Sequence, residues 1–574
     1  MLENGDLIIR YLERLGVEYV FGVPGGSIEP FYNALARSER RGGIKAVISR
    51  HETGAAFMAE GYARETGRLG VCCSTAGPGA TNLITGVASA YADNIPMLVI
   101  SAQTSLDRFG QGSLQESSCT SINTMEMFAR CTRYNTFVSH TAQLETKLLQ
   151  AVSYALGNQP GPSHLGIPLD VMRHPVSDDS SHQNLRAFTH HDVAPSPDAT
   201  QLLLKELSSV SKVTVVLGEG SAEAAHILIS LAESKHWQIV TTPRGKGIVD
   251  SYHPLYRGVF GFAGHQSAAE ALKTTNADLV LVVGSALDEV STSGWDTTAI
   301  LSDRLIHISR NPEHLTRSTM ARLVILGSPK LTLTPIADAL AIETGGSFVS
   351  TTEHHTQLPT QIQLDNREGC ENFSGKIKPQ ALMTYMSREC PSNARVLMDS
   401  GNSFLWGIHH WNVRRNEDQD PSKKFFHIGI GFSSMGWAIG ASVGVASAVK
   451  SAPVICFTGD GSYLMAGQEI TTALQENLNL LMVVLNDSSL GMVRHGQSLS
   501  GGEPIGNRLP VIRYADMAEA MGIESYRIET MEQLLSLDLE SILQRSGPCL
   551  LDVIIDRDEV PPMGSRMKVL TGAV

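Results

Sequence analysis

Two acidic residues that each follow an apolar run are the part of this sequence best suited to chemistry. Asp460 comes shortly after residues 454–457 and lies inside the Gly-Asp-Gly turn 459–461. Asp487 comes shortly after residues 480–485, and both apolar runs are typical of buried parallel strands. Residues 463–476, between them, have helical periodicity and predict an apolar helix face made of Leu464, Met465, Ile470, Ala473 and Leu474.

Strand, turn, helix and strand in succession place both carboxylates at one edge of a sheet. Open α/β sheets bind ligands at the carboxyl ends of their strands. A helix that begins there offers free N–H groups and the positive end of its dipole to a phosphate. Mg²⁺ prefers one or two carboxylates together with phosphate oxygens and water. The local chemistry therefore predicts a Mg²⁺–diphosphate site, although a lone Gly-Asp-Gly would be a common turn.

The two halves of this site stand at a spacing that is found in a known motif. Gly459-Asp460-Gly461 is followed by Asn486-Asp487, which begins 26 residues after Asp460. The pair resembles the thiamine-diphosphate motif of the thiamine-dependent decarboxylase and carboligase family. The resemblance implies that Asp460, the Asp487 side chain and the Ser489 carbonyl hold Mg²⁺. It also implies that their neighbours contact the cofactor: Gly459, Gly461, Ser462, Leu490, Gly491 and Met492.

A second acid stands at a predicted strand-to-helix junction in the first third of the chain. Glu52 follows the predicted strand 44–49 and begins a helix rich in Ala and Met. One interpretation is an ordinary first-turn glutamate that the helix dipole favours. Its surroundings suggest more, because four segments resemble, in order, the pyrimidine-binding domain of acetolactate-synthase-like enzymes: 23–26, 50–52, 58–64 and 76–82.

That resemblance implies that Glu52 is the carboxylate that activates the cofactor. A carboxyl group in a mostly apolar pocket can share a proton with the aminopyrimidine N1′, which favours the imino tautomer that removes the thiazolium C2 proton. The resemblance also places Gly25, Pro78 and Asn82 beside the cofactor. Gln115 matches a glutamine that reaches the donor-derived adduct, although the preceding Phe of the family is a Leu here. An ordinary polar loop residue is the alternative for Gln115.

The last third of the chain carries further residues that match the family. After a predicted strand, the resemblance assigns Asn402 and Ser403 to the diphosphate. Met435 would be the bulky residue that bends the cofactor into a V shape, a near-attack arrangement, and the Ser433 carbonyl would accept from its 4′-amino group. On sequence alone, a methionine such as Met435 is more often part of a hydrophobic core. The biosynthetic enzymes carry Trp at the position of Gly496, so the acceptor pocket is predicted to be open.

The middle of the chain predicts another doubly wound sheet. Three apolar runs, 213–217, 279–283 and 305–308, are typical of its strands. In the resembling family this domain binds FAD or ADP in some members and nothing in others. Residues 286–290 replace an Arg-Phe-Asp-Asp-Arg run of the biosynthetic acetolactate synthases and lack both arginines. This difference argues against FAD and puts a 2-keto acid as acceptor in doubt.

Composition narrows the class of protein. The chain has 574 residues and a net charge of −13, from 45 basic and 58 acidic residues. That length predicts three or four domains. The acidic balance, without a Lys/Arg stripe among aromatics, argues against nucleic-acid binding. The eight cysteines lack metal-ligand spacing, so we interpret them as small buried hydrophobes in a reducing compartment.

No export or membrane signal stands out. The N-terminus lacks a basic region followed by a long apolar run, so we expect no signal peptide and a cytoplasmic protein. Residues 428–449 carry no charged side chain. A membrane span is one interpretation, but the many Gly, Ser and Ala residues favour a buried loop and helix at a subunit interface.

Together these segments predict an α/β protein of three doubly wound parallel-sheet domains. The expected units are a pyrimidine-binding domain at 1–175, a linker at 176–195, a middle domain at 196–345, a linker at 346–375 and a diphosphate-binding domain at 376–574. Since Glu52 and the Asp460 site meet across a subunit interface in the resembling family, a homodimer or homotetramer is expected.

The resemblance implies a carboligase that uses thiamine diphosphate and Mg²⁺. Such an enzyme decarboxylates pyruvate or a related 2-keto acid and transfers the acyl-anion equivalent to a carbonyl acceptor, giving acetolactate or an acyloin. Three alternatives stay open: a 2-keto-acid decarboxylase that does not ligate, an acyltransferase, and a catalytically silent regulatory paralogue. Intact Glu52, Asp460 and Asp487 speak against the last.

Overall fold

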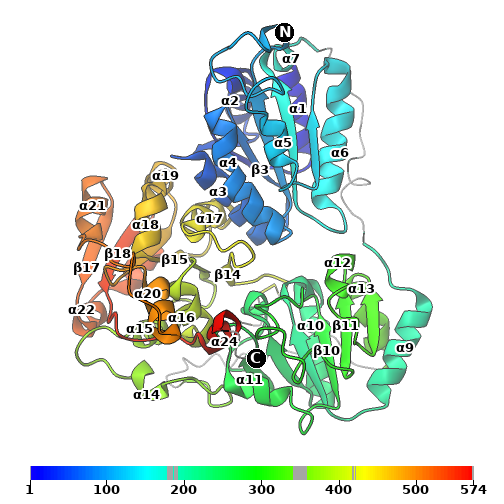
Figure 1. Cartoon of the computed structure of the whole chain (residues 1–574), viewed down its shortest axis with the longest axis vertical. Helices are drawn as coiled ribbons and strands as arrows, with labels where there is room; N and C mark the ends of the chain where they lie inside the picture. The colour runs from blue at the N-terminus through cyan, green and yellow to red at the C-terminus, as the bar shows by residue number, and fades with distance from the viewer. Residues whose placement is uncertain are drawn as a thin grey trace.

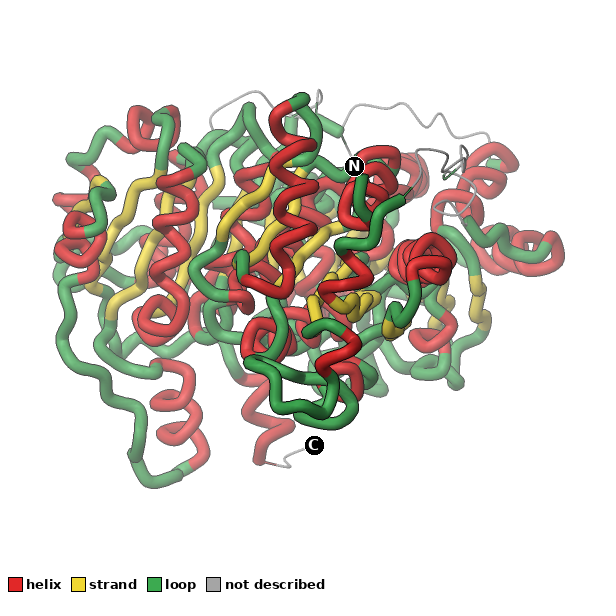
Figure 2. The backbone as a smooth tube through the Cα atoms, turned by 90° about the horizontal axis from the view of Figure 1, so that it is seen from above, coloured by secondary structure: helices red, strands yellow, loops and turns green. Residues whose placement is uncertain are grey.

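The structure contains three separate sheets, each of six parallel strands with flanking helices (Figure 1). It is a computed structural model that describes residues 2–176, 185, 192–340, 358–416, 419–420 and 422–571. Seen from above, the strands lie between the helices (Figure 2). The predicted class, an α/β protein of three doubly wound parallel sheets, is confirmed.

The first sheet has the strand order β2-β1-β3-β4-β6-β5. Its strands are β1 (Tyr19–Val23), β2 (Lys45–Ile48), β3 (Gly70–Ser74), β4 (Met97–Gln103), β5 (Tyr134–Phe137) and β6 (Pro162–Pro168). Its helices are α1 (Asn4–Arg14), α2 (Glu29–Arg40), α3 (Glu52–Thr66), α4 (Pro78–Ala92), α5 (Thr124–Phe128), α6 (Leu144–Leu156) and α7 (Leu169–Met172). The strand order reverses between β1 and β3, so a ligand-binding crevice is expected at their carboxyl ends.

The second sheet has the strand order β12-β11-β10-β7-β8-β9. Its strands are β7 (Val213–Leu217), β8 (Gln238–Thr241), β9 (Tyr256–Val259), β10 (Leu279–Val283), β11 (Leu305–Ser309) and β12 (Leu323–Leu326). The helices in this part of the chain are α9 (Pro197–Ser208), α10 (Ala225–Lys235), α11 (Gln266–Ala271), α12 (Pro312–Leu315), α13 (Pro329–Ala339) and α14 (Arg367–Cys370). Here the order reverses between β7 and β10.

The third sheet has the strand order β14-β13-β15-β16-β18-β17, which repeats the pattern of the first. Its strands are β13 (Arg395–Met398), β14 (Phe426–Ile428), β15 (Val454–Gly459), β16 (Leu480–Asn486), β17 (Glu524–Ile528) and β18 (Pro548–Ile554). Its helices are α15 (Pro379–Glu389), α16 (Asn402–His410), α17 (Trp437–Ala448), α18 (Asp460–Ala466), α19 (Ile470–Gln475), α20 (Gly491–Ser500), α21 (Tyr514–Ala520), α22 (Met531–Leu535), α23 (Leu539–Gln544) and α24 (Gly564–Thr571).

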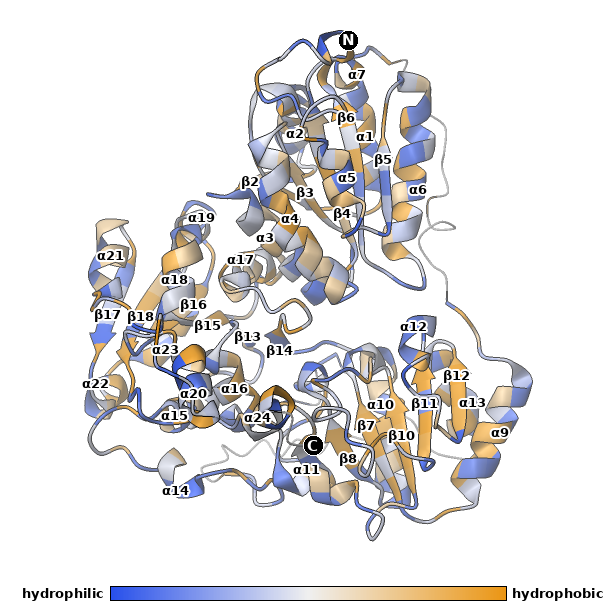
Figure 3. Ribbon diagram, in the orientation of Figure 1, coloured by the Kyte–Doolittle hydropathy of each residue, from blue (hydrophilic) through white to orange (hydrophobic). Residues whose placement is uncertain are grey.

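The central strands, such as β7 and β10, are among the most apolar parts of the chain because helices cover both faces of the sheet (Figure 3). In β7, β10 and β16 every residue is buried. Burying one Val, Leu or Ile side chain contributes about 1.5–3 kcal/mol, so these continuous apolar runs are central parts of the hydrophobic clusters around the second and third sheets. This is also why their positions could be predicted within a residue or two.

Helices α3 and α17 join the first region of the chain to the third. A Cβ at Gly61 of α3 would lie 2.1 Å from the Ala441 carbonyl oxygen, and one at Gly444 of α17 would lie 1.9 Å from the Met58 carbonyl oxygen. The two backbones can therefore approach only because these positions are glycine. Most of the uncharged run 428–449 is thus the helix α17, which is buried against α3 of the same chain, while Phe432 before it is exposed. The predicted subunit interface stays a prediction.

No helix among the described residues is long and apolar enough to cross a membrane. Seven of the eight cysteines are buried as predicted, but Cys119 is exposed, which corrects the interpretation of all eight as buried hydrophobes. Of the two predicted linkers, residues 177–184, 186–191 and 346–357 lie outside the described residues.

The helix predicted at 463–476 is broken into two. α18 ends at Ala466, the 3₁₀ turn η6 (Gly467–Glu469) follows, and α19 begins at Ile470. Ile470 and Ala473 are buried as predicted, but three members of the predicted apolar face are exposed: Leu464, Met465 and Leu474. The 3₁₀ turn changes the phase of the helix, so one periodic face cannot run through both halves.

Candidate active site

Strands β15 and β16 bring Asp460 and Asp487 to one edge of the third sheet. The strands pair so that Gly459, at the end of β15, stands opposite Leu485, near the end of β16. Asp460 is the first residue of α18 and only 2% exposed. Its Oδ2 atom has no hydrogen-bond partner among the described residues. The two acids therefore meet at the edge where the sequence predicts a magnesium site.

The electrostatics of this pair favour a cation. Burial, followed by the charge of Asp487, raises the pKa of Asp460 to about 7. Burial also raises the pKa of Asp487. The backbone N–H of Gly461 donates to Asp460 Oδ1 at 2.8 Å and that of Ser489 donates to Asp487 Oδ1 at 3.0 Å, which offsets these effects only in part. Buried like charges are stabilised by a counter-ion between them.

The residues present therefore fit Mg²⁺, with the Ser489 carbonyl as a third candidate ligand. Ser489 is held in place by an isolated antiparallel bridge to Arg508. The site offers two acids only, and no cluster of three or more His, Cys, Asp or Glu residues that could hold a metal ion is found anywhere among the described residues.

Asn402, the first residue of α16, lies near the acid pair. Its Nδ2 lies 3.2 Å from Nδ1 of His495, and its Oδ1 is buried without a partner among the described residues. A Cβ at Gly491 would lie 2.6 Å from Asn402 Nδ2 and 2.9 Å from Asp487 Oδ2, so only glycine lets α20 begin here. Asn402, Asp487 and Gly491 thus converge on one polar space.

Other predicted cofactor contacts surround the turn at Asp460. A Cβ at Gly461 would lie 2.6 Å from Leu490 Cδ2 and 3.4 Å from Met435 Cε, so two large apolar side chains flank this glycine. A Cβ at Gly459 would meet nothing within 4 Å, which leaves open space beside the backbone there. Ser462 is buried in the next turn of α18.

Two of the predicted serines make hydrogen bonds within the chain. Ser433 lies in the left-handed region with a φ of 58°, and its carbonyl accepts from Ser400 Oγ at 2.9 Å. The Ser403 hydroxyl donates to the Asp399 carbonyl at 2.8 Å inside α16. The Ser433 carbonyl keeps a second lone pair for a ligand, whereas the Ser403 hydroxyl is already used as a donor.

Glu52 lies at the corresponding edge of the first sheet. It is the first residue of α3, 9% exposed, and its Oε2 accepts from Asn82 Nδ2 at 2.9 Å. A Cβ at Gly79 would lie 3.3 Å from Glu52 Oε1, so the glycine leaves room for the carboxylate. Pro78 begins α4 behind Gly77, whose φ of 65° permits the tight turn. Glu52, Pro78 and Asn82 therefore lie together at this edge of the sheet, and their contact with a cofactor stays a prediction.

The loop that carries Gln115 lies on this turn. Gln115 is exposed and has a φ of 60°, and a Cβ at Gly77 would lie 3.0 Å from its carbonyl oxygen. The neighbouring Glu116 anchors the loop, because hydrogen bonds, the Gly110 N–H first among them, lower its pKa to about 2. Gly25 follows β1 and approaches Thr75 after β3, so it borders the same crevice.

Glu469 is a buried acid that the sequence did not single out. It lies in η6 of the third region, yet it accepts from the backbone N–H of Arg50 at 3.0 Å and of His51 at 2.9 Å. A Cβ at Gly54 would lie 2.2 Å from its Oε1. Glu469 therefore holds the turn that positions Glu52. No local pattern could reveal this contact, because it joins residues more than 400 positions apart.

Glu52 and the Asp460 pair remain separate within one chain. No hydrogen bond or ion pair between described residues joins Glu52 to Asp460 or Asp487. They stand at the edges of two different sheets, the first and the third.

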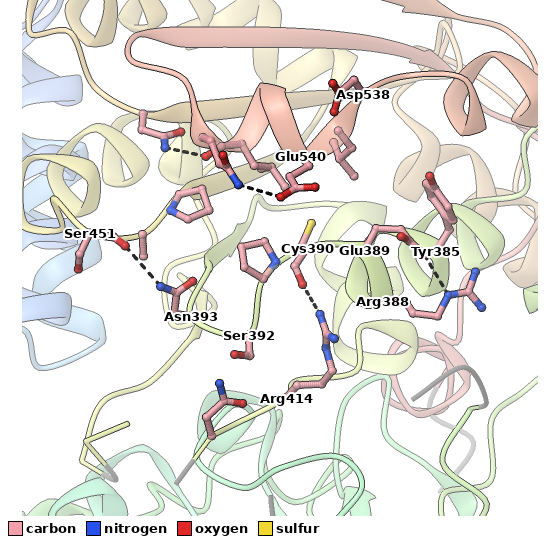
Figure 4. Close-up of a pocket in the computed structure, with 18 of the residues that line it drawn as sticks. Tyr385, Arg388, Glu389, Cys390, Ser392, Asn393, Arg414, Ser451, Asp538 and Glu540 are labelled. Carbon is pink, nitrogen blue, oxygen red and sulfur yellow. Dashed lines mark hydrogen bonds and ion pairs between the residues drawn. The ribbon is translucent and has the colours of Figure 1, made fainter. Parts of the chain in front are cut away.

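The largest cavity that we describe lies at the opposite edge of the third sheet. It has a volume of about 1,020 Å³ and is lined by residues just before β13, β15 and β16 (Figure 4). Its polar groups bond one another: the Arg414 guanidinium donates to the Cys390 carbonyl, and Asn393 Nδ2 donates to the Ser451 carbonyl at 3.4 Å. Ligands of open sheets bind at the carboxyl ends of strands, so this cavity is not the active site.

A cavity of about 750 Å³ lies at the carboxyl ends of β7, β10 and β11, where a dinucleotide would bind. Six acids but only four arginines line it. The buried Arg244 is already paired with Asp288 at 2.5 Å and with Asp93 at 3.2 Å. A diphosphate would therefore have to compete with two carboxylates for this guanidinium. This environment is poorly suited to the diphosphate of FAD, the cofactor against which residues 286–290 also argue.

Comparison with protein families agrees with this geometry. Residues 2–125 match the family model described as the N-terminal TPP binding domain of thiamine pyrophosphate enzymes. Residues 200–336 match the central domain of those enzymes, and residues 399–553 match their C-terminal TPP binding domain.

Three relatives that match nearly the whole chain are named as acetolactate synthases. The acetolactate synthase isozyme 2 large subunit of Escherichia coli is 30% identical over 99% of this chain and 99% of its own length. The acetolactate synthase of Arthrospira platensis is 30% identical over 96% of this chain and 94% of its own. The acetolactate synthase large subunit of Lactococcus lactis is 28% identical over 98% of this chain and 94% of its own.

Proposed function

This chain belongs to the thiamine pyrophosphate enzymes of the acetolactate synthase type, and from that premise we propose that it is a carboligase. It decarboxylates pyruvate or a related 2-keto acid and transfers the acyl unit to a carbonyl acceptor. The observation that supports this most is the buried pair of Asp460 and Asp487, in which one carboxylate oxygen has no partner among the described residues. Such a pair suits the cation that holds a diphosphate.

The overall reaction balances without an oxidant. The bond between C1 and C2 of the 2-keto acid breaks and CO₂ leaves. A bond then forms between C2 and the carbonyl carbon of the acceptor, whose oxygen takes up a proton. Pyruvate as the acceptor gives acetolactate, and an aldehyde gives an acyloin.

The side chains of Asp460 and Asp487 and the Ser489 carbonyl would hold Mg²⁺, and Asn402 with the start of α20 would face the diphosphate. When bound, thiamine diphosphate supplies the electron sink that stabilises the carbanion equivalent. Leu490 and Met435 flank the space beside Gly461.

Glu52 would hold and return one proton at its carboxylate. Asn82 donates to its Oε2, which leaves Oε1 facing Gly79 and free to exchange that proton. Because Glu469 fixes the preceding turn through two backbone N–H groups, the carboxylate is held in one orientation. Proton transfer by a positioned group of this kind contributes about 10²–10⁴-fold in rate.

We also propose that the active site forms between two copies of the chain, in a homodimer or homotetramer. Glu52 and Asp460 lie at the edges of two different sheets, and in the proposed dimer each would face its counterpart on a second copy. Apolar side chains beside the cofactor edge are exposed in the single chain, among them Phe432, which is 52% exposed, and Met465, which is 59% exposed. Such surfaces are typical of protein interfaces.

One incubation tests the proposed reaction. The protein, Mg²⁺ and thiamine diphosphate are mixed with pyruvate, alone and with added aldehydes or keto acids, and products are identified by mass. The proposal expects CO₂ together with acetolactate or an acyloin. Free acetaldehyde without a ligation product would indicate a simple decarboxylase, and no release of CO₂ would indicate a silent paralogue.

A further inference from the structure

A third cavity lies directly beside the proposed cofactor position. It has a volume of about 370 Å³, within the range of about 300–1,000 Å³ that small-molecule pockets occupy. The third region contributes Phe404, Ser433 and Met492 to its lining. Ser433 and Met492 are themselves predicted cofactor contacts, so a molecule in this cavity would lie next to the reacting centre.

Six apolar side chains line this cavity beside four charged ones. Phe262 and Val290 come from the middle region, and Ile430 and Phe404 come from the third. The Phe262 and Phe404 rings lie 5.8 Å apart between centroids and are tilted by 55°. Two aromatic rings in this arrangement favour an apolar or aromatic guest by burial and by edge contacts.

The C-terminal helix α24 covers the cavity. Arg566 and Val569, three positions apart and so on one face of the helix, both line it. Met563 before the helix is buried in the core of the third region, and Met567 packs against that core. On the other side, the Arg566 guanidinium donates to the Glu289 carboxylate of the middle region. Figure 1 shows α24 between the third and second sheets.

Every ionisable group that lines the cavity already has a partner of opposite charge. The lining holds two arginines, Arg244 and Arg566, and two acids, Asp288 and Glu289. Arg244 Nη1 lies 2.5 Å from Asp288 Oδ2, and Arg566 pairs with Glu289. A carboxylate entering this space would have to displace an acid from its guanidinium and remain beside that acid. An uncharged carbonyl compound meets no such penalty.

We propose that this cavity is the acceptor pocket, and that it takes an uncharged aldehyde with an aromatic or other bulky apolar substituent in preference to a 2-keto acid. The inference rests on the proposed carboligase function. With an aromatic aldehyde, C2 of pyruvate bonds to the aldehyde carbon, CO₂ leaves from pyruvate, and the aldehyde oxygen takes up a proton to give a hydroxyketone.

A competition between acceptors tests the inference in the complete enzyme with Mg²⁺ and thiamine diphosphate. Pyruvate and benzaldehyde are supplied at equal concentration, and acetolactate and 1-hydroxy-1-phenylpropan-2-one are quantified together with CO₂. We expect the aromatic hydroxyketone to exceed acetolactate by about tenfold, the discrimination that 1.4 kcal/mol gives.

The outcomes separate the two proposals. CO₂ release with acetolactate as the equal or major product would overturn the acceptor assignment and leave the carboligase intact. CO₂ release without either ligation product, or no CO₂ at all, would overturn both proposals.

Glu289→Gln tests the charge argument, because it frees Arg566 while keeping the shape of the side chain. The share of acetolactate should rise about tenfold, since an unpaired guanidinium can then receive the acceptor carboxylate. Glu270→Gln, on the exposed face of α11, is the matched control and should leave the product ratio unchanged. Both side chains are partly or fully exposed, and the midpoint of thermal unfolding checks that each variant is folded. An unchanged ratio in folded Glu289→Gln would overturn the role of this ion pair.

Discussion

The first and third sheets share one strand order, yet the acids at their carboxyl edges have different surroundings. In each sheet an acid is the first residue of a helix at the crevice: Glu52 in α3 and Asp460 in α18. Glu52 has an amide partner in Asn82. Asp460 has an acidic neighbour in Asp487 and an oxygen without a partner among the described residues.

The difference shows how one scaffold can carry two kinds of carboxylate. An acid with a fixed hydrogen-bond donor is held in one orientation, which suits proton transfer. Two acids that are buried side by side repel each other when both are charged. A bound cation or a proton removes this repulsion, which suits cation binding. The following variants test whether Glu52 and Asp460 have these two different roles.

Asp460→Asn should have the largest effect on cofactor binding. It removes the charge that attracts the cation but keeps the size of the side chain, so we expect affinity for Mg²⁺ and thiamine diphosphate to fall by at least about 100-fold, or 2.7 kcal/mol. Titration calorimetry measures the affinity. Asp516→Asn, which alters an exposed ion pair on α21, is the control and should bind normally. Wild-type affinity in Asp460→Asn would remove Asp460 from the cation site.

Glu52→Gln should leave cofactor binding almost intact and slow the chemistry instead. We expect a rate loss of about 10²–10⁴-fold, because Gln keeps the hydrogen bond to Asn82 but cannot exchange a proton. Proton exchange at the cofactor C2, followed by NMR, measures this step directly. If the affinity of Glu52→Gln for Mg²⁺ and thiamine diphosphate fell as far as that of Asp460→Asn, Glu52 would also serve in cofactor binding. The two acids would then not have different roles.

Glu469→Gln should have an intermediate effect that reaches Glu52 through the backbone. The neutral amide accepts less strongly from the N–H groups of Arg50 and His51, so C2 exchange should slow by about tenfold and the free energy of unfolding should fall by about 1–2 kcal/mol. Cofactor affinity should not change. A variant with lower stability but a normal exchange rate would mean that Glu469 is only structural.

The pH dependence of the cation-free protein should show the smallest effect. The pKa of Asp460 in the folded state is about 7, above its ordinary value of about 3.9, so the folded state keeps a proton that the unfolded state has lost between those values. The free energy of unfolding should therefore fall as pH rises from about 4 to about 7, and stay level above that.

This effect should be on the order of 2 kcal/mol, after allowance for relaxation of the buried pair. Denaturant unfolding at several pH values measures it. Asp487→Asn, which removes the repelling charge, should flatten the curve, and saturating Mg²⁺ with thiamine diphosphate should do the same. A curve in which stability rises over this range would contradict the buried acid pair.

Much of the fold could be predicted from the sequence, because several strands are continuous apolar runs. The predicted runs 213–217 and 279–283 coincide with β7 and β10, since a strand covered on both faces must be apolar throughout. The helix at 463–476 could not be placed as well, because the turn at Gly467 interrupts a pattern that still looks periodic. Leu464 and Met465 belonged to that pattern and proved exposed.

The sequence by itself determined that Asp460 and Asp487 lie close together. Each follows its own strand, and adjacent parallel strands end at a common edge, so spacing along the chain was enough to bring them together. The tertiary structure alone decided that Glu469 holds the turn before Glu52 and that Arg566 closes a cavity against Glu289. These contacts join residues hundreds of positions apart, and only the packing of one region on another fixes which side chains meet.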